Sequence, residues 1–141
     1  SNRQWSQSAA GELPGQKASI LLAEDNPINQ KLASHLLSKA GFRLTIVKNG
    51  QEAIQQVRQS PEEFDLVLMD IQMPVLDGLE ATRILRREGY LNLPIIAMTA
   101  ESMKGDREKC IAAGMNDYIA KPIKRERVLN VIEKWVGSPK D

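Results

Sequence analysis

Runs of consecutive apolar residues alternate along the chain with segments in which apolar residues recur every three or four positions. Three unbroken runs lie at residues 20–23, 66–69 and 95–98. Continuous apolar runs of this length are typical of strands that are covered on both faces, as in a parallel sheet between helices. Two weaker runs, at residues 44–47 and 117–120, predict two further strands.

A segment with helical spacing follows each predicted strand. The first begins after Asn26-Pro27, a typical helix start, and carries Ile28, Leu32 and Leu36 at every fourth position. The other four are marked by these apolar sets: Ala53, Ile54 and Val57; Leu79, Ile84 and Leu85; Cys110, Ile111 and Met115; Val128, Val131, Ile132 and Trp135. Five strand–helix pairs with right-handed crossovers predict a three-layer α/β sandwich.

The length and composition fit one globular domain. The chain has 141 residues, of which 26% are charged and 42% are hydrophobic, so we expect it to fold rather than to remain disordered. Residues 1–18 contain only Trp5 and Leu13 as large apolar side chains, which indicates a linker or a cloning remnant. We expect the folded domain at residues 19–136 and a C-terminal tail at residues 137–141.

Charge and cysteine content exclude several classes of protein. The net charge of +1 gives no excess of Lys and Arg for binding nucleic acid. The single cysteine, Cys110, excludes a disulfide framework and a zinc site of several thiolates. The cluster of Arg83, Arg86 and Arg87 is typical of a solvated helix face. No apolar run is long enough to cross a membrane and no signal peptide opens the chain, so a cytoplasmic location is predicted.

Polar side chains stand at the end of each strong strand. Glu24 and Asp25 follow the first run, Asp70 follows the second, Thr99 follows the third, and Lys121 comes after the fifth strand. If the first, third, fourth and fifth strands are neighbours, these side chains converge at the carboxyl edge of the sheet, where ligands bind in open α/β folds. Three crowded carboxylates favour a divalent cation, and oxygen ligands without His or Cys indicate Mg²⁺, with Mn²⁺ as a substitute.

This set of groups suits the transfer of a phosphoryl group. A metal, the Lys121 ammonium and the Thr99 hydroxyl together neutralise and bind phosphoryl oxygens. An aspartate can act as the nucleophile and form an acyl phosphate. Asp70 is central in the predicted cluster and is therefore the candidate nucleophile.

Four separated motifs closely resemble those of the receiver domains of two-component response regulators. They are Glu24-Asp25-Asn26, Asp70-Ile71-Gln72-Met73-Pro74-Val75-Leu76-Asp77-Gly78, Thr99-Ala100 and Lys121-Pro122. The resemblance covers about residues 18 to 136. It implies one doubly wound five-stranded parallel sheet of flavodoxin-like order 2-1-3-4-5 with five flanking helices.

The resemblance also assigns roles at the acidic cluster. It implies that Asp70 is the phosphoacceptor and that Asp25 binds Mg²⁺ directly. Glu24 would act largely through metal-bound water, and the backbone carbonyl of Gln72 would complete the protein ligands.

Further roles concern switching and the lifetime of the phosphoryl group. Thr99 and Lys121 would contact the phosphoryl oxygens, and Tyr118 matches the aromatic switch position, which moves inward when Thr99 is drawn to the phosphate. The surface of the fourth helix, fifth strand and fifth helix would then rearrange. Gln72 and Glu101 would flank the path of the attacking water and tune a slow autodephosphorylation, the only catalysis expected beyond self-phosphorylation.

The local sequence at Asn29-Gln30 and at residues 69–74 is most similar to that of receivers in hybrid sensor histidine kinases. That similarity implies a phosphorelay in which Asp70 receives its phosphoryl group from a phosphohistidine. The expected partners are a histidine kinase transmitter domain, a histidine phosphotransfer domain, or both, with no direct nucleic acid binding. The parent kinase can be membrane-anchored although this segment is not inserted.

Other functions of the same fold class make different demands on the sequence. A stand-alone single-domain regulator and a phosphorylation-independent interaction module remain alternatives. A nucleotide- or flavin-binding domain needs a Gly- or Ser/Thr-rich phosphate cradle after the first strand, but the loop at residues 24–27 is acidic. A haloacid-type phosphatase needs a second acid two residues after its nucleophile, where this chain has Gln72.

Each candidate residue also has a simpler role when it is taken singly. Glu24 and Asp25 would gain about 0.3–1 kcal/mol at a helix N-terminus, and Asp70 fits a turn. Lys121 would be an ordinary surface lysine, and Tyr118 a strand residue with its hydroxyl at the rim. None of these roles explains why three carboxylates should converge.

Overall fold

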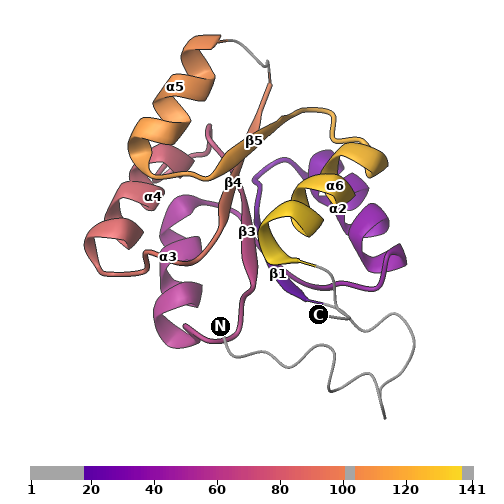
Figure 1. Ribbon diagram of the computed structural model, residues 1–141, viewed down its shortest axis with the longest axis horizontal. Helices are drawn as coiled ribbons and strands as arrows, with labels where there is room; N and C mark the ends of the chain where they lie inside the picture. Colours follow the sequence, from indigo (N-terminus) through magenta and orange to yellow (C-terminus); the bar gives the residue numbers. More distant parts are fainter. Residues whose placement is uncertain (1–17, 101–103, 138–141) are drawn as a thin grey trace.

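The computed structural model describes residues 18–100 and 104–137, and a central sheet separates two layers of helices (Figure 1). The strands are β1 (Ser19–Ala23), β2 (Arg43–Val47), β3 (Leu66–Asp70), β4 (Ile95–Thr99) and β5 (Asp117–Ala120). The helices of the described ranges are α2 (Pro27–Lys39), α3 (Gly50–Gln59), α4 (Gly78–Arg87), α5 (Lys104–Ala113) and α6 (Arg125–Val136).

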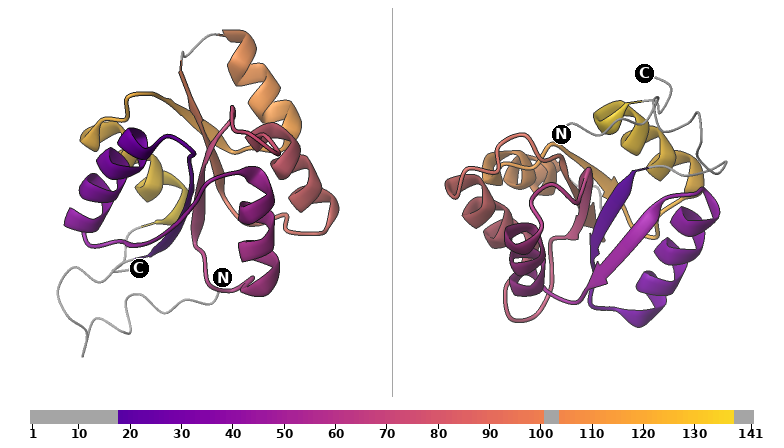
Figure 2. Two further views of the ribbon diagram at one scale, coloured as in Figure 1. Left: turned by 180° about the vertical axis from the view of Figure 1, so that it is seen from behind. Right: turned by 90° about the horizontal axis from the view of Figure 1, so that it is seen from below.

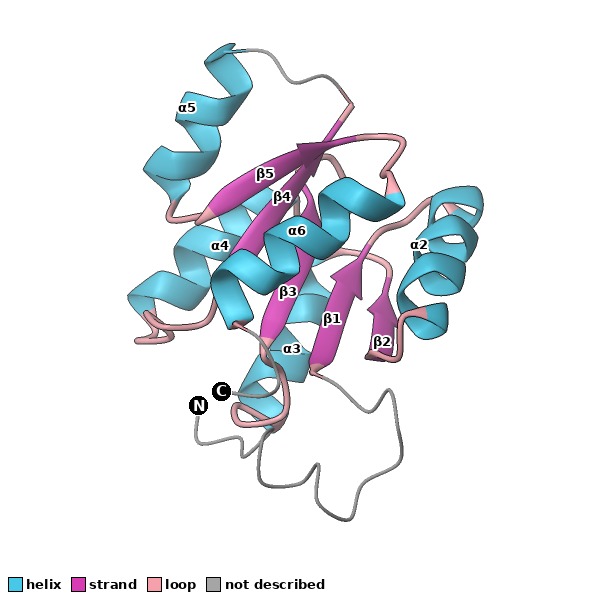
Figure 3. Cartoon of the chain, turned by 45° about the vertical axis from the view of Figure 1, so that its right-hand side comes forward, coloured by secondary structure: helices cyan, strands magenta, loops and turns pink. Residues whose placement is uncertain are grey.

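The sheet has the predicted topology. All neighbouring strands are parallel, in the order β2-β1-β3-β4-β5, which confirms the doubly wound sheet of order 2-1-3-4-5. Helices α3, α4 and α5 cover one face, and α2 and α6 cover the other (Figure 2). Because the strands are parallel, their carboxyl ends meet at one edge of the molecule (Figure 3).

The three strong apolar runs form the inner strands. Every residue of β1, β3 and β4 is buried, because alternate side chains of one strand enter opposite cores. Leu21, for example, packs in the core under α3, α4 and α5, and Leu22 in the core under α2 and α6. Strands β2 and β5 lie at the two edges and are only partly buried, which explains their weaker apolar runs.

The expected apolar face of α2 is wrong at Ile28, which is 77% exposed. The residues of α2 that are buried against the sheet are Ala33 and Leu37. The first turn of α2 starts at the carboxyl edge where β1 ends, and only the later turns lie over the face of the sheet.

The prediction of a solvated arginine cluster is wrong at Arg86, which is hydrogen-bonded to the surrounding loops. Its guanidinium donates four hydrogen bonds of 2.6 to 2.9 Å, to the carbonyl oxygens of Tyr90, Leu93 and Gly114 and to Oδ1 of Asn116. Burial lowers the pKa of Arg86. The side chain therefore joins the end of α4 to the loops that precede β4 and β5, because main-chain carbonyls there need donors.

A second polar contact joins α6 to β5. The indole Nε1 of Trp135 donates to Oδ2 of Asp117 at 2.9 Å, and Lys134 Nζ lies 3.6 Å from the same oxygen. Burial by itself would raise the pKa of Asp117, but these donors and the Tyr118 N–H hold it below its ordinary value.

The start of the folded region includes Ala18, which is buried and accepts a hydrogen bond from the Arg43 N–H. The rest of the expected linker, residues 1–17, and residues 138–141 of the expected tail lie outside the described residues.

Candidate functional site

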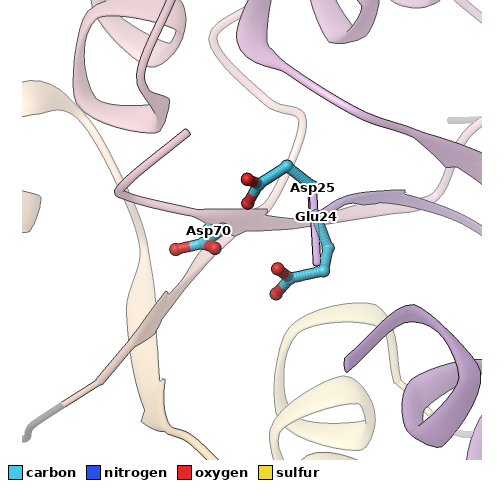
Figure 4. Close-up of side chains that lie close together, drawn as sticks. All are labelled: Glu24, Asp25 and Asp70. Carbon is cyan, nitrogen blue, oxygen red and sulfur yellow. The ribbon is translucent and has the colours of Figure 1, made fainter. Parts of the chain in front are cut away.

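The acidic side chains singled out in the sequence lie together. Glu24 and Asp25 follow β1, and Asp70 is the last residue of the adjacent β3. One carboxylate oxygen from each residue lies within 4.8 Å of the others. Figure 4 shows the three side chains reaching into one region from two segments of the chain. The parallel pairing of β1 and β3 thus brings together carboxylates that are more than forty residues apart in sequence.

Lys121 supplies the positive charge of this cluster. It follows β5, and its Nζ lies 2.9 Å from Asp70 Oδ2 and 3.3 Å from Glu24 Oε1. Burial by itself would lower the pKa of Lys121, but the hydrogen bond and charge of Asp70, together with Glu24, outweigh burial and raise it. The ammonium therefore stays charged between the two carboxylates. The Lys121–Pro122 peptide bond is cis.

Glu24 is almost fully buried, at 1% exposure, and its pKa is raised. Burial is the largest cause, and the charge of Asp70 adds to it; the Asn26 N–H and Lys121 act in the opposite direction. The Asn26 N–H donates to Glu24 Oε2 at 3.0 Å. Asn26 also caps α2, because its Oδ1 accepts from the N–H groups of Ile28 and Asn29.

Asp70 is held by the loop that follows it. Its Oδ1 accepts the Gln72 N–H at 3.0 Å. The loop closes against the end of β3 at Gly78, where a Cβ atom would overlap the Asp70 carbonyl oxygen. The loop also contacts α3, because the Gly50 N–H donates to Leu76 O at 2.8 Å. Gly78 is therefore required for the close approach of α4 to the site.

An exposed loop turn lies between these contacts. The Leu76 N–H donates to Pro74 O at 2.7 Å across Val75, whose φ is 70°. A hydrogen bond from residue i+2 to residue i with positive φ at the centre is a γ-turn of the rare, strained kind. Val75 is 80% exposed.

A cleft of about 310 Å³ opens over the carboxylates. It is lined by Glu24, Asp25, Asn26, Pro27, Asn29, Asp70, Gln72, Ala100 and Lys121. Three carboxylates face one ammonium there, so an excess of negative charge remains, and the donors are hard oxygens. This donor set fits Mg²⁺.

The predicted switch residues Thr99 and Tyr118 lie on the neighbouring strands β4 and β5. Thr99 is fully buried at the end of β4, and its carbonyl accepts the Lys121 N–H at 2.6 Å. Tyr118 is half-buried on β5, and the Arg107 guanidinium of α5 lies 5.9 Å from its ring centroid. Glu101 lies outside the described residues, so its expected role has no structural counterpart.

The sequence reasoning missed one side chain that touches the acidic loop. Gln30 Nε2 on the first turn of α2 donates to Glu24 O at 2.5 Å. In the sequence, Gln30 stands out only as part of the stretch that is similar to hybrid kinase receivers. Its position in the sequence could have predicted this contact. Gln30 lies in the first helical turn after the acidic pair, and side chains on a helix point back toward the helix start.

Comparison with known proteins gives one consistent family. The family model for the response regulator receiver domain matches residues 20–133. Among curated relatives, hybrid signal transduction histidine kinase I of Dictyostelium discoideum is 48% identical over 124 residues, which cover 83% of this chain and 7% of the relative. The chain spans between 5% and 17% of the length of the curated relatives it matches.

Two solved structures are informative. The receiver domain of the sensor histidine kinase PA1611 from Pseudomonas aeruginosa PAO1, with a magnesium ion coordinated in its active site cleft, is 45% identical with a TM-score of 0.78, over 86% of this chain and 98% of that one. The complex of the Saccharomyces cerevisiae histidine phosphotransfer protein Ypd1 with the receiver domain of Ssk1 matches at 32% identity and a TM-score of 0.79, over 86% of this chain and 90% of that one. In the part of the chain that the structure describes, no helix is long and apolar enough to cross a bilayer.

Proposed function

The chain belongs to the response regulator receiver family, and on that premise we propose that Asp70 accepts a phosphoryl group from a phosphohistidine with Mg²⁺ bound beside it. It is a receiver domain of two-component phosphorelays and is homologous to the receivers of hybrid histidine kinases. The observation that carries the proposal is the buried Asp70 carboxylate, which is 3% exposed, contacts Lys121 and lies under the open cleft.

The proposed step is an in-line displacement at phosphorus. A carboxylate oxygen of Asp70 forms the new bond to phosphorus while the bond from phosphorus to the donor imidazole nitrogen breaks. The imidazole leaves with that electron pair and takes up a proton. Lys121, already 2.9 Å from Asp70 Oδ2, then pairs with the charge of the acyl phosphate.

The metal would be held by the carboxylates of Asp25 and Asp70, by Glu24 largely through bound water, and by the Gln72 carbonyl. When bound, Mg²⁺ would neutralise the negative charge that the phosphoryl oxygens add to a cleft that is already anionic. The magnesium ion in the similar PA1611 receiver supports this assignment. Substitution by Mn²⁺ is part of the same proposal.

The proposed switch starts at Thr99, whose hydroxyl would bind a phosphoryl oxygen together with Lys121. Movement of Thr99 would let Tyr118 turn inward and bias the surface formed by α5, β5 and α6 between two states. Gln72, which lines the cleft, would tune the lifetime of the phosphoryl group, and Glu101 is proposed to do the same.

The test is phosphorylation by acetyl phosphate, followed by intact mass. With Mg²⁺ we expect the wild type to gain one phosphoryl group and Asp70→Asn to gain none, with equal helical content by circular dichroism. Asp77→Asn is the matched control in the same loop, because asparagine caps a helix as well as aspartate does and Asp77 caps α4. Equal labelling of Asp70→Asn, or no labelling of the wild type with Mg²⁺ present, would refute the proposal.

The wider context is proposed on the same basis. We expect the domain at residues 19–136 to be the cytoplasmic receiver of a hybrid sensor histidine kinase, with a kinase transmitter or a histidine phosphotransfer domain as its partner. The hybrid kinase of Dictyostelium and the Ypd1–Ssk1 complex support this context. A stand-alone regulator is the alternative, and an open reading frame without kinase motifs upstream would favour it.

A further inference from the structure

Asp25 depends on its backbone for its position. No residue in the described ranges donates a hydrogen bond to its carboxylate, and the side chain is exposed. Glu24, by contrast, is fixed at its carboxylate by the Asn26 N–H and by Lys121. With no donor at the carboxylate, the position of the Asp25 side chain depends on the path of its backbone, which includes the peptide unit that joins it to Glu24.

The side chain of Gln30 is hydrogen-bonded to that peptide unit. The carbonyl of Glu24 belongs to the peptide between residues 24 and 25, and Gln30 Nε2 donates to it at 2.5 Å. On the other side of the same residue, the Glu24 N–H donates to Val47 O of β2 at 3.0 Å. The Gln30 backbone N–H in turn donates to Asn26 O at 2.9 Å, which fixes the helical turn that carries the amide.

We propose that Gln30 is a positioning residue for metal binding: its side-chain amide holds the Glu24–Asp25 peptide in the orientation that directs Asp25 toward Glu24 and Asp70. The proposal deepens the proposed function and rests on it. Without the amide, this peptide can rotate, and Asp25 then spends part of its time turned away from the other two carboxylates. The apparent Mg²⁺ affinity then falls in proportion to the fraction of molecules in which Asp25 still faces the other two carboxylates.

The test uses Gln30→Met, which keeps the volume of the side chain and removes its donors. Partners that orient metal ligands typically contribute about tenfold or more to affinity, so we expect the dissociation constant for Mg²⁺ alone, measured by calorimetric titration, to rise about tenfold. Gln55→Met is the matched control, because Gln55 is an exposed glutamine in the middle of α3. It should leave the constant unchanged.

A second readout separates positioning from chemistry. With acetyl phosphate as donor, the Mg²⁺ concentration for half-maximal phosphorylation should rise by the same factor in Gln30→Met, while the rate at saturating Mg²⁺ stays within about twofold of the wild type. Gln30→Asn is one methylene too short to reach the Glu24 carbonyl and should reproduce the loss.

Other results would overturn the proposal. A wild-type Mg²⁺ affinity in Gln30→Met or Gln30→Asn would do so. A lower thermal midpoint without Mg²⁺ at unchanged affinity would also do so, since it would limit Gln30 to stabilising α2. Failure of the wild type itself to bind Mg²⁺ or to accept a phosphoryl group would instead refute the proposed function, so the two failures are distinguishable.

Discussion

The backbone of Val75 is strained, although its side chain is exposed to solvent. A β-branched residue with positive φ is unusual, because its Cβ substituents crowd the adjacent carbonyl. The γ-turn around it places Leu76 where its carbonyl accepts the Gly50 N–H, so the strain lies in the same loop that holds Gln72 against Asp70. The strained turn therefore helps to define the path of the loop beside the cleft.

Glycine should relieve this strain. Relief of about 1–2 kcal/mol exceeds the roughly 0.4–1 kcal/mol that glycine costs through the unfolded chain. We therefore expect Val75→Gly to raise the free energy of unfolding by about 0.5–1 kcal/mol in urea titrations.

The control for this prediction is Leu91→Gly, an exposed apolar loop residue, 67% exposed, without positive φ. It should lower the free energy of unfolding by about 0.5–1 kcal/mol. A decrease at both positions would show that Val75 carries no strain.

At the scale of elements, Arg86 ties α4 to the segments that enter β4 and β5. Its four acceptors lie on two loops, Tyr90 and Leu93 before β4 and Gly114 and Asn116 before β5. The Asn116 side chain also accepts the Ile95 N–H. Removing the guanidinium leaves these partly buried carbonyl groups without their donor, which is the costly way to lose a hydrogen bond.

We expect Arg86→Ala to lower the free energy of unfolding by about 2–3 kcal/mol. Arg86→Lys should lose most of the same energy, because a single ammonium cannot reach four acceptors. Arg83→Ala on the same helix removes an exposed pair with Glu80 and should cost about 0.2–0.5 kcal/mol. Chemical denaturation of the three variants checks this, and equal losses at Arg83 and Arg86 would contradict it.

The elements also show which parts of the fold the sequence could predict. The inner strands are buried on both faces, so their apolar runs mark them almost to the residue. The parallel order of the whole sheet, edge strand β5 included, brings Glu24, Asp25, Asp70 and Lys121 together. Ile28 was misplaced because periodicity locates a helical face but not the point where the sheet beneath it ends.

Contacts to main-chain carbonyls were the other limit of prediction. The acceptors of Arg86 and Gln30 are mostly backbone oxygens, which every residue type supplies. Such bonds leave no partner residue to recognise in the sequence. They become visible only when the loops have been placed in space.

For the whole molecule, the proposed chemistry and the stability of the fold meet at the acidic cleft. Without a metal ion, the carboxylates repel one another and destabilise the folded state. A ligand that binds only the folded state stabilises it. We expect Mg²⁺ at about 100 times its dissociation constant to raise the free energy of unfolding by about 2.7 kcal/mol. A chelator should reverse the gain.

Asp25→Ala is the comparison for that measurement. It removes a proposed metal ligand that has little buried surface of its own, so the variant should fold normally and show little change in thermal midpoint on addition of Mg²⁺. A metal-dependent rise equal to that of the wild type would place the binding of Mg²⁺ elsewhere on the chain.

The contact of Trp135 with Asp117 has a practical consequence. The chain has two tryptophans, Trp5 and Trp135, so a Trp5→Phe protein carries a single indole, bonded to the first residue of the strand that bears Tyr118. Its fluorescence emission is sensitive to that bond. Because Asp117 lies at the opposite end of β5 from Lys121, a change in emission on addition of acetyl phosphate would report a rearrangement where α6 meets the start of β5, in real time and without an attached dye.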